Sequence, residues 1–182
     1  MKGLTHNRRP ALRLVQGAQY EAPAEWVWFC GHCAAPAPKS GPPAPVARVC
    51  NSCGLGLMLE ARSDLVPGDR DAFLMVDDSL MIQGLSRRAE ELLAVTEEVA
   101  INRPVAELLV AADAEASGPH SFAGAIVEAA GGSQAPVSKF VRPWNTFGVR
   151  MRARIGACGP PRAALIVLEA SPRRPLRAVE DR

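Results

Sequence analysis

The chain has 182 residues, of which 48% are apolar and 22% charged, with a formal net charge of +2. This length allows one ordinary domain and a second small one, and the apolar fraction argues against a chain that is disordered throughout. No stretch approaches the roughly 18–20 apolar residues of a membrane helix, and no export signal is recognised. We therefore expect a cytoplasmic protein in a reducing compartment, where cysteines stay thiols or thiolates.

The first 24 residues mix basic and apolar side chains without a clear period, and we predict a flexible basic arm. Residues 25–29 follow as a short aromatic strand that runs directly into Cys30. Four cysteines then form two Cys-x-x-Cys steps, which are Cys30 with Cys33 and Cys50 with Cys53. Each step turns tightly enough to aim both of its sulfurs at one point.

Two such steps predict a closed four-thiolate site that holds a structural Zn²⁺. Disulfides, a redox pair or rubredoxin-like iron are the alternatives for the same cysteines. His32 lies inside the first step, but four thiolates already complete a tetrahedron. Cys158 has no sequence partner, and we interpret it as a strand-end residue rather than a nucleophile.

The segment between the two cysteine pairs contains five prolines in residues 34–45, which exclude a helix or a central strand. We expect the metal to fix both ends of this loop. Residues 55–62 are predicted to be either a short helix or an apolar extended segment. We assign residues 25–63 to a zinc ribbon and residues 64–70 to a linker.

A different pattern begins at residue 71 and continues to residue 170. A hairpin is expected from strands at 73–76 and 80–82, and Ser86 is a good N-cap for a following helix. Pro104 suits the first turn of a short helix through Leu109, and residues 121–130 form a third helical segment that ends at two glycines.

Three strands are predicted at the end of the chain, over residues 137–141, 149–157 and 163–168. In the second of them, apolar residues alternate with Arg150, Arg152 and Arg154, which is the period of a strand. These arginines could bind an anion or a nucleic-acid backbone, although such alternation is typical of a solvent-exposed strand face. The last strand is apolar on both faces and should be central and covered on both sides.

The sequence of residues 73–82 resembles the opening hairpin of PAS domains, and that of residues 86–93 resembles their first helix. Residues 102–109 resemble the later "G-R-P-x-x-E-L-L" segment of the same family. The resemblance covers roughly residues 70–170. It implies an α+β fold in which a five-stranded antiparallel sheet carries helices on one face, with the first and last strands as central neighbours. PAS domains sense small molecules, bind cofactors or dimerise, and they pass the result to a neighbouring module.

The resemblance leaves the organic cofactor unknown. A flavin photoreceptor of this class needs a reactive cysteine in a helix, and residues 94–132 contain none, which argues against flavin adduct chemistry. His120 is the only candidate axial ligand for haem. A histidine beside Gly118 and Pro119 is more typical of a helix start or a surface position.

Residues 49–55 are similar to the second cysteine turn of GATA-type zinc fingers, which read DNA with the helix that follows. The likeness implies the metal ligands. This chain departs from the GATA pattern in the residues that serve DNA binding. Its loop between the cysteine pairs lacks the family's tryptophan and keeps a single arginine, Arg48. The segment after Cys53 has a single basic residue, Arg62, whereas a phosphate-binding surface needs several.

We interpret the chain as a non-enzymatic signalling or transcription-linked regulator in which a zinc ribbon contacts a protein partner and precedes a PAS-like sensor or dimerisation domain. A DNA-binding regulator and a four-cysteine iron redox protein are the alternatives. No phosphate loop and no Ser/His/Asp set is supported by spacing, and residues 171–182 form a short charged tail.

Because residues 73–76 and 163–168 are apolar on both faces, their outward side chains should form one apolar patch that needs a cover. We predict a second copy of the domain as that cover, with the ribbon or the basic arm as alternatives. The ribbon would use its apolar residues Trp26, Trp28, Leu57 and Leu59. The PAS-like region is expected to fold without the ribbon, around a core that includes Phe73, Met75, Leu92, Leu93, Phe122, Val127, Met151 and Leu165.

Overall fold

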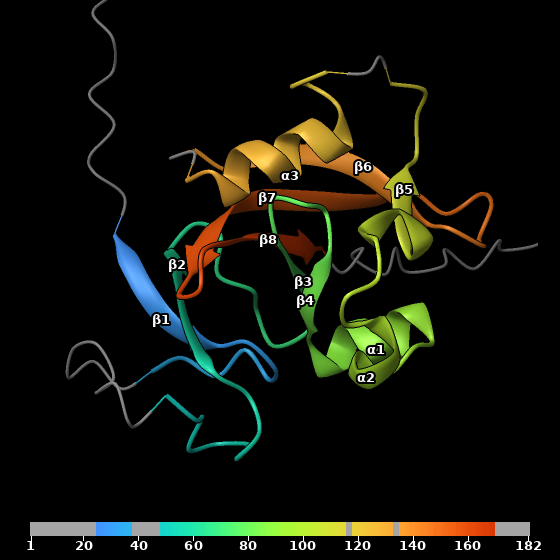
Figure 1. The fold of residues 1–182 in the computed structure, drawn as a ribbon. Helices are drawn as coiled ribbons and strands as arrows, with labels where there is room; N and C mark the ends of the chain where they lie inside the picture. Colours follow the sequence, from blue (N-terminus) through green and yellow to red (C-terminus); the bar gives the residue numbers. More distant parts are fainter. Residues whose placement is uncertain (1–24, 38–47, 116–117, 133–134, 170–182) are drawn as a thin grey trace, which may run out of the picture.

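The computed structural model describes residues 25–37, 48–115, 118–132 and 135–169 (Figure 1). The predicted basic arm (residues 1–24), most of the proline-rich loop and the charged tail (residues 171–182) lie outside the described residues. The fold is α+β, with an antiparallel sheet and short helices. None of the helices in the described ranges is long and apolar enough to cross a membrane.

Eight strands form one sheet, in the order β1-β2-β7-β8-β3-β4, with β6 paired to β7 and β5 to β6. The strands are β1 (Trp26–Cys30), β2 (Met58–Arg62), β3 (Ala72–Val76), β4 (Ile82–Leu85), β5 (Leu109–Ala111), β6 (Val137–Pro143), β7 (Met151–Gly159) and β8 (Ala163–Leu168). The helices are α1 (Arg87–Leu93), α2 (Glu97–Ala100), the 3-10 turn η1 (Val105–Glu107) and α3 (Phe122–Ala130).

The five strands predicted for the PAS-like region are present in the order β4-β3-β8-β7-β6, and β3 and β8 are central neighbours as expected. Three more strands extend this sheet. β5 pairs with β6, and the ribbon strands β1 and β2 join through β2, which pairs with the end of β7 at Cys158 and Gly159. β7 therefore begins and ends two residues later than predicted, and β2 pairs with its last two residues.

Hydrogen bonds of side chains to the backbone account for two element boundaries. Oδ1 of Asp77 accepts the N–H groups of Ser79 and Met81, both at 2.9 Å, so the hairpin turn is longer than predicted and β4 begins only at Ile82. The Ser86 hydroxyl caps α1 by accepting the N–H of Ala89 at 3.1 Å. The predicted Ser86 cap is therefore confirmed.

The prediction for residues 104–109 is partly wrong. Pro104 precedes a single 3-10 turn, η1, and the chain then enters β5 rather than continuing as a helix through Leu109. Pairing of Leu109 with Pro143 of β6 favours the extended form. The short helix α2 was not predicted at all.

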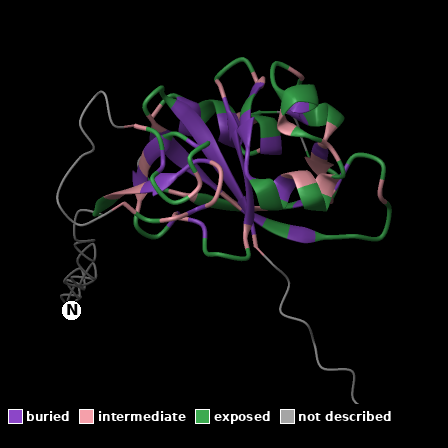
Figure 2. Ribbon diagram, turned by 90° about the horizontal axis from the view of Figure 1, so that it is seen from below, coloured by how far each residue is buried: buried purple, intermediate pink, exposed green. Residues whose placement is uncertain are grey.

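The helix side of the sheet holds the larger of the apolar clusters (Figure 2), in which α3 packs on β7 and β8. Met151 contributes to it from β7 and Phe122 from α3, as predicted. Leu92 and Val127 were expected in the core but are exposed. On α1, Ala89 is buried and Leu93 packs partly buried against the cluster, so Leu93 contributes to the core as predicted. On α3, Ile126 is buried in place of Val127.

The ribbon covers the central part of the opposite face of the sheet, within one chain. Phe73, Leu165 and Val167 point to this side and are each at most 1% exposed. The ring of Phe29 in β1 contacts Phe73 edge-on, with centroids 5.8 Å apart, and Leu59 of β2 packs in the same cluster. The prediction that a second copy covers this patch is wrong, because the ribbon already does. A homodimer as such stays a prediction.

The remaining apolar ribbon residues behave differently from Leu59. Trp26 and Leu57 are exposed, and Trp28 packs beside the cysteines. Leu65, in the predicted linker, is fully buried in the same cluster as Phe29. The division at residues 64–70 stays a prediction, but the ribbon and the PAS-like region share one sheet and one apolar cluster.

Candidate metal centre

The four cysteines lie in two turns of the same construction. Cys30 is the last residue of β1, and the N–H of Ala34 donates to its carbonyl oxygen at 3.1 Å. In the second turn, the N–H of Gly54 donates to the carbonyl oxygen of Cys50 at 2.8 Å. Ala34 and Gly54 both have positive φ angles, 62° and 70°, which turn the chain after the second cysteine of each step. The two turns are therefore structural repeats that face each other.

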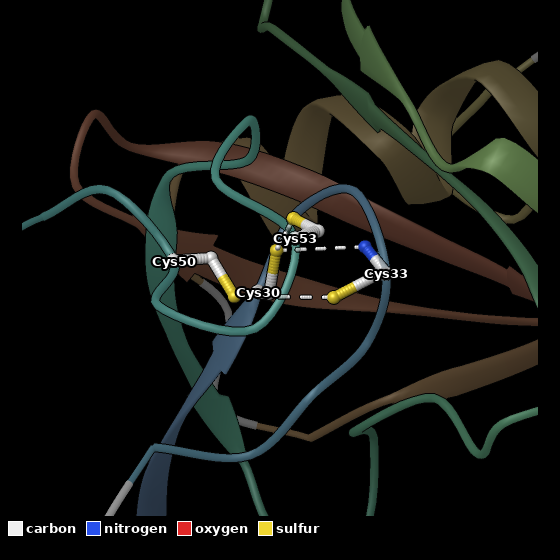
Figure 3. Close-up of side chains that lie close together, drawn as sticks. All are labelled: Cys30, Cys33, Cys50 and Cys53. Carbon is white, nitrogen blue, oxygen red and sulfur yellow. Dashed lines mark hydrogen bonds between the residues drawn. The ribbon is translucent and has the colours of Figure 1, made fainter.

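The four sulfurs converge (Figure 3), and all lie within 4.8 Å of one another. The Sγ atoms of Cys30 and Cys53 are 3.7 Å apart, and those of Cys33 and Cys50 are 3.9 Å apart. A tetrahedron of sulfurs around an ion at about 2.3 Å has edges of about 3.8 Å. The cysteines are free rather than disulfide-bonded, so these spacings fit one metal ion with four thiolate ligands.

Backbone N–H groups point at three of the sulfurs. The N–H groups of His32 and Cys33 donate to Sγ of Cys30 at 3.4 Å, that of Ser52 donates to Cys50 at 3.3 Å, and that of Gly56 donates to Cys53 at 3.4 Å. Donors of this kind stabilise a thiolate more than a thiol. The turns therefore place positive dipoles where four negative sulfurs would gather.

Burial and these donors move the thiol pKa values in opposite directions. Burial raises the pKa of Cys30 to about 12 and also raises that of Cys33. The N–H of Gly56 lowers the pKa of Cys53 to about 6. Burial opposes the ionisation of Cys50, but backbone N–H groups outweigh it and lower its pKa. The group would ionise as a whole only when a cation replaces the protons, as thiolate-bound metals do.

Gly56 is a residue of this centre that the sequence reasoning missed. A Cβ atom at Gly56 would lie 2.4 Å from Sγ of Cys30 and 2.6 Å from Cβ of His32, so a side chain there would displace the first cysteine turn. The signal was present in the Cys-Gly-Leu-Gly sequence of residues 53–56. Met58 is also buried against the cysteines.

The other candidate residues lie apart from the sulfurs. The His32 side chain is not among the ligand atoms that converge, and its carbonyl oxygen instead accepts the N–H of Arg87 at 3.1 Å. Cys158 is buried in β7 among apolar residues, and burial raises its pKa to about 12. His120 is exposed just before Ser121, the N-cap of α3. The organic cofactor stays unknown.

The segment after Cys53 decides how far the GATA likeness extends. Of the two alternatives predicted for residues 55–62, the extended one is correct, since Met58–Arg62 is strand β2, between β1 and the end of β7. A GATA-type finger reads DNA with a helix at this place. The helix that the GATA likeness implied is therefore replaced by a strand here, and the DNA-binding alternative, which also relied on the basic arm, stays a prediction.

The predicted arginine stripe of β7 lies on the face opposite to the helices, as expected. Arg152 and Arg154 form ion pairs with Glu169 at 3.6 and 3.1 Å, and Arg150 contacts Asp113 at 2.7 Å. The stripe is far along the sheet from the cysteines, because β2 meets β7 only at its other end.

No family model matches the chain, and no curated protein matches it in sequence. Among solved structures, the chain is similar to the PAS domain of nitrogen regulation protein NR(II) from Vibrio parahaemolyticus, with 15% identity and a TM-score of 0.40. The match covers 54% of this chain and 87% of that chain. The PAS-like strand order is established by the strand pairing described above, not by this match. The match assigns no ligand or activity to this protein.

Proposed function

We propose that this protein is a non-enzymatic regulator in which a structural Zn²⁺, bound by Cys30, Cys33, Cys50 and Cys53, fixes a ribbon onto a PAS-like sensor or dimerisation domain. The observation that carries the proposal is the set of sulfur–sulfur distances of 3.7 and 3.9 Å within two facing cysteine turns. These distances match the edges of a tetrahedral thiolate site. Free thiols of this kind suit a cytoplasmic location.

The position of the centre supports a structural role for the metal. Cys30 ends β1, and the residue before it, Phe29, is buried against Phe73 of the PAS-like sheet. The metal would hold the loop-rich ribbon in the one arrangement that covers this sheet face. Because such a site rarely exists in the unfolded chain, the free energy of metal binding would also stabilise the docked ribbon.

The ribbon also offers a surface for a protein partner. Leu55 and Leu57 follow the second cysteine turn and are both exposed, although leucines prefer burial. We propose that they contact a protein, which includes a second copy of this chain. Sedimentation velocity over a range of concentrations tests self-association, and a Leu55→Ser, Leu57→Ser variant should abolish any dimer that forms through the ribbon.

Metal identity is tested by native mass spectrometry and absorption spectroscopy of the purified protein. We expect one zinc per chain and no visible absorption band. Iron in the same cage would give a coloured protein and would support the redox alternative. Cys50→Ser should lose the metal, whereas the matched control Cys158→Ala should keep full stoichiometry. A Cys50→Ser variant that keeps its zinc would contradict the assignment.

A further inference from the structure

The ribbon covers only part of the outer face of the sheet and leaves β6 and the first half of β7 open. Met151, Ala153 and Ile155 belong to the helix-side cluster, so the arginines between them point to the opposite face. Register pairs Phe140 with Arg152, which places Phe140 on that same face. We call this open surface the arginine face, and it consists of Phe140, Arg142, Arg150, Arg152 and Arg154.

Two aromatic rings on this surface each lie against a guanidinium group. The Arg150 guanidinium carbon lies 3.8 Å from the ring centroid of Phe140, and that of Arg142 lies 4.9 Å from the ring of Phe147. Phe147 is 84% exposed and Trp144 60%, both in the β6–β7 turn. Phe140, Trp144 and Phe147 are therefore exposed rings close to the guanidinium groups of this face, and they can stack against a ligand.

The charges of the arginine face leave it with a positive excess. Arg150 pairs with Asp113, Arg152 and Arg154 share Glu169, and Arg154 also pairs with Asp71 at 4.0 Å. Arg142 donates to the backbone carbonyl oxygens of Pro143 and Trp144 instead of to a carboxylate. The side chains of Arg150 and Arg152 are each 54% exposed, and exposed ion pairs contribute about 0–1 kcal/mol, so an incoming anion can compete for these two guanidinium groups.

We propose that the arginine face binds single-stranded nucleic acid, with guanidinium groups on phosphates and the exposed rings stacked against bases. Such binding sites combine a positive track for the backbone with aromatic platforms that accept any base. Arginines two residues apart on a strand are spaced by about 6.7 Å, which is close to the phosphate spacing of an extended single strand.

Two features favour a single strand over the other occupants. A guanidinium group lies against each of Phe140 and Phe147, which gives the face the combination of positive charge and exposed rings that single-strand sites use. A duplex keeps its bases stacked on one another, so the faces of the bases are unavailable to the exposed rings. The proposal is independent of the metal centre, which lies toward the other end of β7.

Fluorescence anisotropy of the full chain with labelled dT15, U15 and a 15-base-pair duplex tests the proposal. We expect single strands to bind more tightly than the duplex, with affinity that falls as salt rises. The variant Arg142→Ala, Arg152→Ala should weaken binding of the single strands at least tenfold and lower the salt slope by about 1.4, because each phosphate contact of a single strand contributes about 0.7. Phe140→Ala with Phe147→Ala should weaken binding several-fold. Arg88→Ala, an exposed arginine on α1, is the matched control and should change nothing.

Three results would overturn the proposal: no oligonucleotide binding at low salt, equal binding of the duplex, or binding that the arginine-face variants leave unchanged. The last result would place binding elsewhere in the chain. If no oligonucleotide binds but these variants alter sedimentation, the face is a protein surface. Circular dichroism and zinc content of each variant separate a lost site from a lost fold.

Discussion

Removing the ring of Phe29 should destabilise the whole chain rather than the ribbon alone. Phe29 is fully buried and its ring contacts Phe73 edge-on at 5.8 Å. Truncating a buried phenylalanine to alanine costs about 3–5 kcal/mol, and the lost aromatic pair is part of that cost. With a urea m value of about 2 kcal/mol/M, Phe29→Ala should lower the unfolding midpoint by about 2 M.

The assay uses two probes in a Trp144→Phe background. Fluorescence then reports the ribbon tryptophans Trp26 and Trp28, while circular dichroism reports the sheet and helices. Because the ribbon and the sheet share one apolar cluster, both probes should follow a single transition that shifts together in Phe29→Ala. Trp26→Ala, on the same strand but exposed, is the control and should shift the midpoint much less. Two separate transitions, or a shift seen only by fluorescence, would refute the shared core.

Three further predictions follow from single residues. Ser86→Ala should lower the free energy of unfolding by about 2–4 kcal/mol, because the hydroxyl caps α1 and also accepts the N–H of Phe73 at 2.9 Å. Thr96→Ala is the control, because Thr96 is an N-cap without a side-chain hydrogen bond, and it should cost little. Equal losses of stability in denaturant melts of the two variants would contradict the role of Ser86. Gly56→Ala should weaken zinc retention against a chelator, because the added Cβ would overlap Sγ of Cys30. Gly68→Ala is the control and should leave zinc retention unchanged. Unchanged retention in both variants would argue against the close packing of Gly56 on the first cysteine turn. Cys158 should resist alkylation in the native protein at pH 8, because burial raises the pKa of its thiol to about 12. Burial favours the neutral thiol, so the contribution of Cys158 to folding stability is complete below pH 9 and is lost as the pH rises toward 12. Alkylation as fast as in urea would show that the thiol is accessible.

Local features could be predicted from the sequence where a residue type has one well-defined structural role. The cysteine pairs bring their four sulfurs together, Ser86 caps its helix, and residues 163–168 form a strand that is buried on both faces. The alternation of Arg150, Arg152 and Arg154 also gave the correct outward face. Each of these depends on turn geometry or on strand period, which a short sequence window contains.

The relation between the ribbon and the sheet could not be predicted in the same way. Phe29 and Leu65 pack on Phe73 and Leu165, residues that are distant in the sequence, and no local pattern states which apolar face covers which. Leu92 of α1 and Val127 of α3 were predicted to point inward, although alanines, Phe122 and Ile126 are the buried residues of these helices. Alanine carries a weak hydrophobic signal, so the sequence did not show which side of each helix faces the sheet.

We propose that a zinc ion in the four-cysteine centre keeps the ribbon on the outer face of the sheet. Hydrogen exchange measured by mass spectrometry, with and without a zinc chelator, tests it most directly. After zinc removal we predict faster exchange in β1 and β2 and also in β8, which lies under the ribbon at Leu165, while α3 on the other face changes least. Unchanged exchange in β8 when the metal leaves would contradict the account.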